Sequence, residues 1–70
     1  MLGEINMIKG YRTACNITQQ EMASALGITD KTYQKLESNP LKFTLEQMQK
    51  FTDEIKKKQP TTSISDIFLK

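Results

Sequence analysis

The stretch of sequence that decides the fold is Ile17–Thr29, which reads ITQQEMASALGIT. Near its start, Thr18-Gln19-Gln20-Glu21 is a capping box, in which the threonine hydroxyl accepts from an amide of the first helical turn and the glutamate reaches back. This pattern predicts a helix over residues 19–26. Gly27 then supplies the positive φ of a sharp turn, and a second helix is expected over residues 30–37. Two helices joined by so short a turn have the spacing of a helix-turn-helix.

Three more helices are expected outside this pair. A second capping box, Thr44-Leu45-Glu46-Gln47, predicts a helix over residues 45–55, and the weaker pattern Ser63-Ile64-Ser65-Asp66 predicts a short one over residues 64–69. An earlier helix is expected over about residues 4–15. The sequence holds no valine, and no segment alternates apolar and polar residues over a useful length. The fold class is therefore all-α, a compact bundle of about five short helices.

Apolar residues recur at helical spacing in these segments and predict one shared core. The expected core residues are Ile5, Ile8, Tyr11 and Cys15 in the first helix, Met22, Ala23 and Leu26 in the second, Ile28, Tyr33 and Leu36 around the turn and the third, and Leu45, Met48, Phe51 or Thr52, and Ile55 in the fourth. Asn16 stands where a left-handed residue would end the first helix, and asparagine tolerates that conformation better than most residues.

Length and composition exclude several classes of protein. At 70 residues and 8.0 kDa the chain makes one domain at most, with little room for a buried catalytic cavity. Histidine is absent and Cys15 is the only cysteine, so Cys/His zinc sites and Ser-His-Asp triads cannot be assembled within one chain. We therefore expect no enzyme, no cofactor and no metal site. The formal charge of +2 and the pI near 8.8 are too mild a basic excess to identify a partner.

The expected location is the cytoplasm. No apolar run approaches the roughly 20 residues of a membrane span. The opening residues Met1–Glu4 lack the basic and apolar regions of a signal peptide. A single thiol also fits a reducing compartment.

The stretch Ile17–Thr29, together with Leu36-Glu37-Ser38-Asn39, resembles the Cro/cI-type helix-turn-helix family of phage and bacterial regulators. The resemblance covers about residues 5–55, and Tyr33 departs from it where the family usually has Ile or Val. It implies a lambda-repressor-like fold in which the helix near 30–37 enters the major groove of DNA. The implied function is a sequence-specific double-stranded DNA-binding transcriptional regulator, most simply a small Cro-like repressor.

The resemblance also implies roles for single residues. Three are structural: Gly27 forms the turn, and Arg12 and Glu37 form an ion pair between the first and third helices. The residues expected to contact base edges are Asp30, Lys31, Thr32 and Lys35, and those expected to contact the DNA backbone are Gln19, Gln34 and Lys42.

Other interpretations of these residues stay open. Asp30 in a first helical turn can simply complement the helix dipole, and Lys31 and Lys35 can form a solvated face. The run Lys56–Lys58 has a solvated helix end as its simplest interpretation. An alternative function keeps the fold but makes the chain an antitoxin-like or regulatory module whose main role is to bind another protein.

The last twelve or so residues are expected to be separate from the helix-turn-helix domain over residues 1–58. Residues 59–70 combine a polar linker with a short capped helix that carries Ile64, Ile67 and Phe68. These side chains can pack on their own core or on a second subunit. A twofold dimer reads two half-sites about 34 Å apart, so we expect a homodimer, at least on DNA, with these three residues as its contact.

Overall fold

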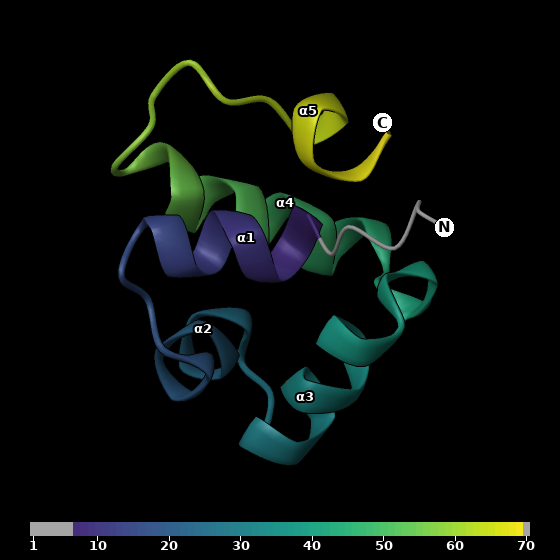
Figure 1. Ribbon diagram of the computed structural model, residues 1–70. Coiled ribbons are helices and arrows are strands. Elements are labelled where there is room, and N and C mark those ends of the chain that lie inside the picture. The colour runs from purple at the N-terminus through teal and green to yellow at the C-terminus, as the bar shows by residue number, and fades with distance from the viewer. Residues whose placement is uncertain (1–6, 70) are drawn as a thin grey trace.

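The computed structural model describes residues 7–69, and every regular element among them is helical (Figure 1). The predicted all-α class is confirmed for this part of the chain. The expected start of the first helix at residues 4–6, and the core position of Ile5, lie outside the described residues. The elements are α1 (Met7–Ala14), α2 (Gln19–Leu26), α3 (Asp30–Ser38), the 3₁₀ turn η1 (Pro40–Lys42), α4 (Leu45–Lys56) and α5 (Ile64–Phe68).

Capping boxes explain where three of these helices begin. At the start of α2, the Glu21 amide donates to the Thr18 hydroxyl at 3.0 Å and the Thr18 amide donates to the Glu21 carboxylate at 2.9 Å. The same reciprocal pair of bonds joins Thr44 and Gln47 at the start of α4. Ser63 and the residue three positions later form a third box at α5. All three predicted capping patterns are therefore present, and each satisfies amides that a helix end leaves without a partner.

Two residues with positive φ make the turns on either side of α2. Asn16 has φ 58° in the connection from α1, and Gly27 has φ 74° directly after α2. The Gly27 amide donates to the Ser24 carbonyl at 3.1 Å and the Ile28 amide donates to the Ala23 carbonyl at 3.0 Å, which closes the helix. A Cβ atom at Gly27 would meet no other atom within 4 Å. The backbone conformation, rather than a lack of space, is what favours glycine there.

The core lies between the helices: α2 packs against α3 and α4, and α5 packs against α1 and α4. Its members among the described residues are Ile8, Cys15, Met22, Ala23, Leu26, Tyr33, Leu36, Phe43, Phe51, Ile55 and Ile67. Most were expected, but Leu45 was placed wrongly, because its side chain is 66% exposed. Leu45 opens α4 at the edge of the core, and Phe43 from the preceding connection is buried there and packs edge-on against Phe51 at a centroid distance of 6.0 Å.

The C-terminal segment folds back onto its own chain. Helix α5 packs against α1 and α4, and it lies over α4 in Figure 1. Ile67 is 3% exposed, and the Phe68 ring stands 5.0 Å from Phe43 and 5.8 Å from Phe51, centroid to centroid. Ile67 therefore belongs to the core of its own chain and the half-buried Phe68 packs against that core, which is one of the two arrangements considered for these side chains. Ile64 is half-buried.

The connection between α4 and α5 is also tied to the rest of the molecule. The Lys58 ammonium donates to the Cys15 carbonyl at the end of α1, at 3.0 Å, and Thr62 is buried. A lysine at that position satisfies a carbonyl that the helix end leaves open. The polar stretch expected as a linker is thus part of the packed structure. Within residues 7–69 no helix is long and apolar enough to cross a membrane.

Candidate nucleic-acid interface

Helix α3 has one buried and one exposed face. Tyr33, Leu36 and Glu37 point into the molecule, while the polar residues between them face outward. The structure brings the four residues that were expected to contact bases onto this exposed side of one helix: Asp30, Lys31, Thr32 and Lys35. Charged and hydroxyl groups exposed on one helix can donate to and accept from base edges in the major groove of DNA, which is about 12 Å wide.

The first turn of α3 is organised by Thr29. Its hydroxyl accepts from the Thr32 amide at 3.2 Å and donates to the Thr32 hydroxyl at 2.9 Å. The Thr32 hydroxyl therefore already has one partner within the chain. Asp30 stands in the same turn and is exposed, which fits either of the roles considered for it, because the helix dipole favours a carboxylate at that end.

Two shallow depressions flank α3. One is polar and contains both glutamines expected to contact the DNA backbone. It is lined by Lys9, Gln19, Gln34, Glu37 and Ser38. The other contains Lys42 beside two of the expected base-contacting residues and is lined by Thr32, Lys35, Leu36, Ser38, Asn39 and Lys42. The sequence did not single out Lys9, Ser38 or Asn39. Ser38 and Asn39 belong to the Leu36–Asn39 motif of the family resemblance, so the sequence could have indicated their place at the site. No pattern in the sequence indicated Lys9.

A buried ion pair fixes α3 against α1. The Arg12 side chain donates to Glu37 through Nε, 2.8 Å from Oε2, and through Nη2, 3.0 Å from Oε1. Its Nη1 atom donates to the Ile17 carbonyl at 2.8 Å and so also holds the connection that leads into α2. The two side chains are 9% and 5% exposed. This bidentate geometry is the one that a guanidinium and a carboxylate prefer.

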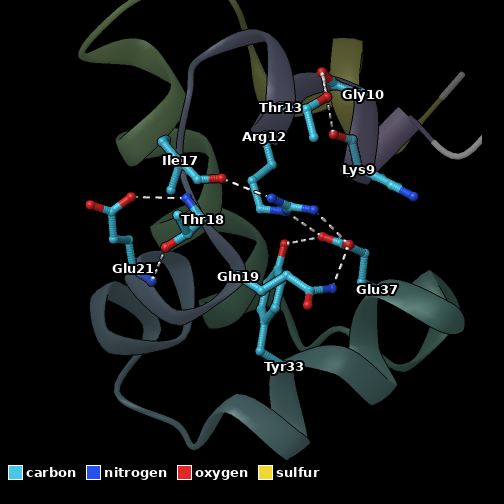
Figure 2. A network of polar contacts seen from close by, with 10 residues as sticks. All are labelled: Lys9, Gly10, Arg12, Thr13, Ile17, Thr18, Gln19, Glu21, Tyr33 and Glu37. Atoms are coloured by element: carbon cyan, nitrogen blue, oxygen red, sulfur yellow. Dashed lines mark hydrogen bonds and ion pairs between the residues drawn. The ribbon is translucent and has the colours of Figure 1, made fainter.

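Two further donors converge on the same carboxylate (Figure 2). The Tyr33 hydroxyl donates to Glu37 Oε2 at 2.6 Å, and Gln19 Nε2 donates to Glu37 Oε1 at 3.0 Å. Glu37 thus joins α1, α2 and α3 at one point. The sequence marked Tyr33 only as a core residue that departs from the family pattern. Tyr33 stands four residues before Glu37 on the same helix, and residues at this spacing lie on one face, so the sequence could have predicted this hydrogen bond.

These contacts determine the charge states of the cluster. The hydrogen bond to Glu37 raises the pKa of the Arg12 guanidinium above its ordinary value. Burial would by itself raise the pKa of the Glu37 carboxyl, but hydrogen bonds from Arg12, Tyr33 and Gln19 outweigh it and hold that pKa below its ordinary value. Burial and the bond to Glu37 raise the pKa of the Tyr33 phenol well above its ordinary value. The cluster therefore consists of a cation, an anion and two neutral donors at neutral pH.

The sequence profile of a helix-turn-helix family matches residues 8–58 of the chain. This span begins in α1, contains the whole Arg12–Glu37 cluster and ends just after α4. The chain belongs to the Cro/C1-type helix-turn-helix family. Comparison with curated proteins and with solved structures found no match.

Membership of the Cro/C1-type family makes the protein a DNA-binding helix-turn-helix regulator. The family is one of regulators rather than of enzymes. Helices α2 and α3 are the two helices of the motif, and Gly27 stands at the turn between them. The all-helical, compact architecture is the lambda-repressor-like fold of this family.

Removal of the Tyr33 hydroxyl tests its bond to the buried carboxylate. In Tyr33→Phe, Glu37 keeps the two bonds from Arg12 but loses a donor, so we expect the free energy of unfolding to fall by about 1–2 kcal/mol. Urea unfolding at neutral pH measures the change. The matched control is Tyr11→Phe, which removes the same hydroxyl from a half-buried ring of α1 and should change stability by less than about 0.5 kcal/mol. Equal losses in the two variants would contradict the assigned role of the Tyr33 bond.

Stability should depend on pH at both ends of the range. Because the folded pKa of Glu37 is lowered, its contribution is complete above the ordinary carboxyl pKa of about 4.3 and is lost as the pH falls through the folded value. Because the folded pKa of Tyr33 is raised, its contribution is complete below about pH 10 and is lost above it. The measurements are urea unfolding across pH and an NMR titration of the Glu37 carboxyl carbon. A Glu37 midpoint above about 4.3 would contradict the sign of the shift.

Proposed function

We propose that the protein is a sequence-specific regulator of the Cro type, which represses transcription by occupying a DNA operator with α3 in the major groove. The observation that carries this proposal is that Asp30, Lys31, Thr32 and Lys35 are all exposed on α3, whose buried face is fixed by Glu37. Lysine donates to guanine O6 and N7, and aspartate accepts from cytosine N4. A helix that cannot rotate or slide presents these groups in one register, which is what discrimination between base pairs needs.

The two depressions beside α3 support the assignment of backbone contacts. Gln19 uses one N–H of its amide for Glu37, and an amide nitrogen carries two, so the second can meet a phosphate on one side of the groove. Lys42 lies in the depression on the other side, beside Lys35. Contacts with the two strands on either side of the groove would fix the register of α3 without carrying sequence information.

Selection of bound sequences from random duplex DNA tests this proposal. The expected result is one recurrent short sequence, with an affinity for it at least about a thousandfold above that for unrelated duplex at the same salt concentration. The matched control is Gln20→Ala, an exposed position of α2 outside both depressions, which should return the same sequence.

A random output at about 50 mM salt would overturn the proposal. It would favour the alternative in which this fold serves to bind another protein. The selected sequence also shows at once whether two half-sites with twofold symmetry are needed, because the half-sites of a palindrome would appear with a fixed spacing of about one helical turn.

A further inference from the structure

Lys9 of α1 lies at the polar depression beside α3, although it belongs to neither helix of the helix-turn-helix. It is exposed and stands three residues before Arg12, a spacing that places two side chains on one face of a helix. Figure 2 shows the Lys9 side chain leaving α1 on the side where Glu37 lies. Helix α1 therefore adds a cation to a surface that α2 and α3 otherwise form.

The carboxylate that lines this depression does not make it acidic. Glu37 receives two hydrogen bonds from Arg12 and one each from Tyr33 and Gln19. Its side chain is 5% exposed, so little of its charge faces the solvent. The charges of Arg12 and Glu37 cancel as a pair, and Lys9 then gives the depression a net positive charge.

The other groups that line the depression are neutral hydrogen-bond donors. Gln19 has a second N–H beside the one it gives to Glu37, Gln34 carries a primary amide, and Ser38 carries a hydroxyl. An ammonium surrounded by amides and a hydroxyl suits an oxyanion, and these are the side chains that contact phosphate oxygens in DNA complexes. An apolar ligand would leave the same groups without partners.

The position of the depression indicates which oxyanion it meets. Gln34 and Ser38 belong to α3, the helix that carries the exposed residues expected to contact bases. With α3 in the major groove, the phosphates of the two DNA strands flank it on either side. Lys42 lies in the depression on the other side of α3. Lys9 and Lys42 would therefore meet different phosphates.

We infer that Lys9 is a DNA-contacting residue, whose ammonium neutralises the backbone phosphate that Gln19 also contacts. The inference rests on the proposed function for the placement of α3 in the groove. It extends the DNA contact from the helix-turn-helix to α1. A lysine that neutralises a phosphate releases a counter-ion, whereas a neutral glutamine does not, so Lys9 gives this side of the interface its dependence on salt.

The salt dependence of Lys9→Gln tests this contact. The slope of log affinity against log salt should fall by about 0.9 on the selected duplex and equally on an unrelated duplex. The affinity should fall about tenfold at about 50 mM salt and less at higher salt, with no change in the preferred base pairs. Glutamine forms helices nearly as well as lysine, so the variant should keep the circular dichroism and melting temperature of the wild type.

Three further variants serve as controls. Lys9→Arg should restore the wild-type slope, because a guanidinium also neutralises a phosphate. Lys50→Gln removes the same charge from an exposed site in neither depression beside α3 and should keep the slope. The double variant Lys9→Gln and Lys42→Ala should lose about 1.8 in slope, because the two lysines meet different phosphates.

A wild-type slope in Lys9→Gln would overturn the inference, even if the chain binds a specific sequence. An equal fall in Lys50→Gln would also overturn it, since the net charge of the protein would then explain the loss. A chain that binds all duplexes alike, with a slope that still falls in Lys9→Gln alone, would contradict the proposed function and support the contact at Lys9. The two failures are therefore distinguishable.

Discussion

Replacement of Glu37 by alanine should lower the free energy of unfolding by about 3–5 kcal/mol. The variant leaves a buried guanidinium without its counter-ion, because Arg12 is 7% exposed and makes its two side-chain contacts with this carboxylate. It also removes the acceptor of Tyr33 and Gln19. The melting temperature and the urea midpoint, compared with those of the wild type at pH 7, measure the loss.

A compensated variant separates charge burial from loss of packing. The triple replacement Arg12→Met, Glu37→Leu and Tyr33→Phe removes the cation, the anion and the phenol together, and apolar side chains of similar volume take their places. Apolar replacements of a whole buried cluster are often neutral, so we expect this variant to recover most of the stability lost in Glu37→Ala. An unchanged melting temperature in Glu37→Ala would contradict the structural role of the pair.

The second large effect concerns DNA binding. Different lysines should determine the sequence specificity of binding and its overall affinity. Lys31→Ala and Lys35→Ala should each cost about 1–3 kcal/mol on the selected sequence, with the loss confined to one base-pair position. Lys42→Ala should weaken binding to all duplexes about equally and reduce the slope of log affinity against log salt by about 0.9. Binding isotherms on the selected duplex and on single base-pair variants of it, at several salt concentrations, measure both quantities.

Lys50→Ala supplies the control for this series. Lys50 is an exposed lysine of α4 that pairs with Glu46 at 3.4 Å and lines neither depression beside α3. Its replacement should change neither the preferred base pairs nor the affinity by more than about 0.5 kcal/mol. Sequence-independent losses of the same size for Lys31, Lys35 and Lys42 would refute the assignment of base contacts to α3.

Local signals in the sequence predicted most of the fold because the helices of this chain carry their own start and stop residues. The capping patterns at Thr18, Thr44 and Ser63 placed three helix starts, and Asn16 and Gly27 marked the two turns that need positive φ. These features depend on residues within one turn of each other. A single sequence therefore contains the information that sets them.

The features that the sequence did not predict depend on residues far apart in the chain. The position of α5 depends on the path of residues 57–63, which brings Phe68 against Phe43 and Phe51. No local sequence pattern predicts that path. The exposure of Leu45 depends on Phe43 filling the end of the core. For the candidate site, the spacing placed the exposed residues of α3, but the convergence of Gln19 and Tyr33 on Glu37 required the crossing angle of three helices.

The position of α3 in the major groove can be tested directly by changing the DNA. Substitution of 7-deazapurines for the purines of the selected half-site removes the N7 acceptors of the major groove and leaves base pairing and the minor groove unchanged. We expect the affinity of the wild type to fall at least about tenfold on this duplex, with a smaller fall for Lys35→Ala, which has already lost one donor. An affinity equal to that for the unmodified duplex would contradict the claim that α3 reads bases in the major groove.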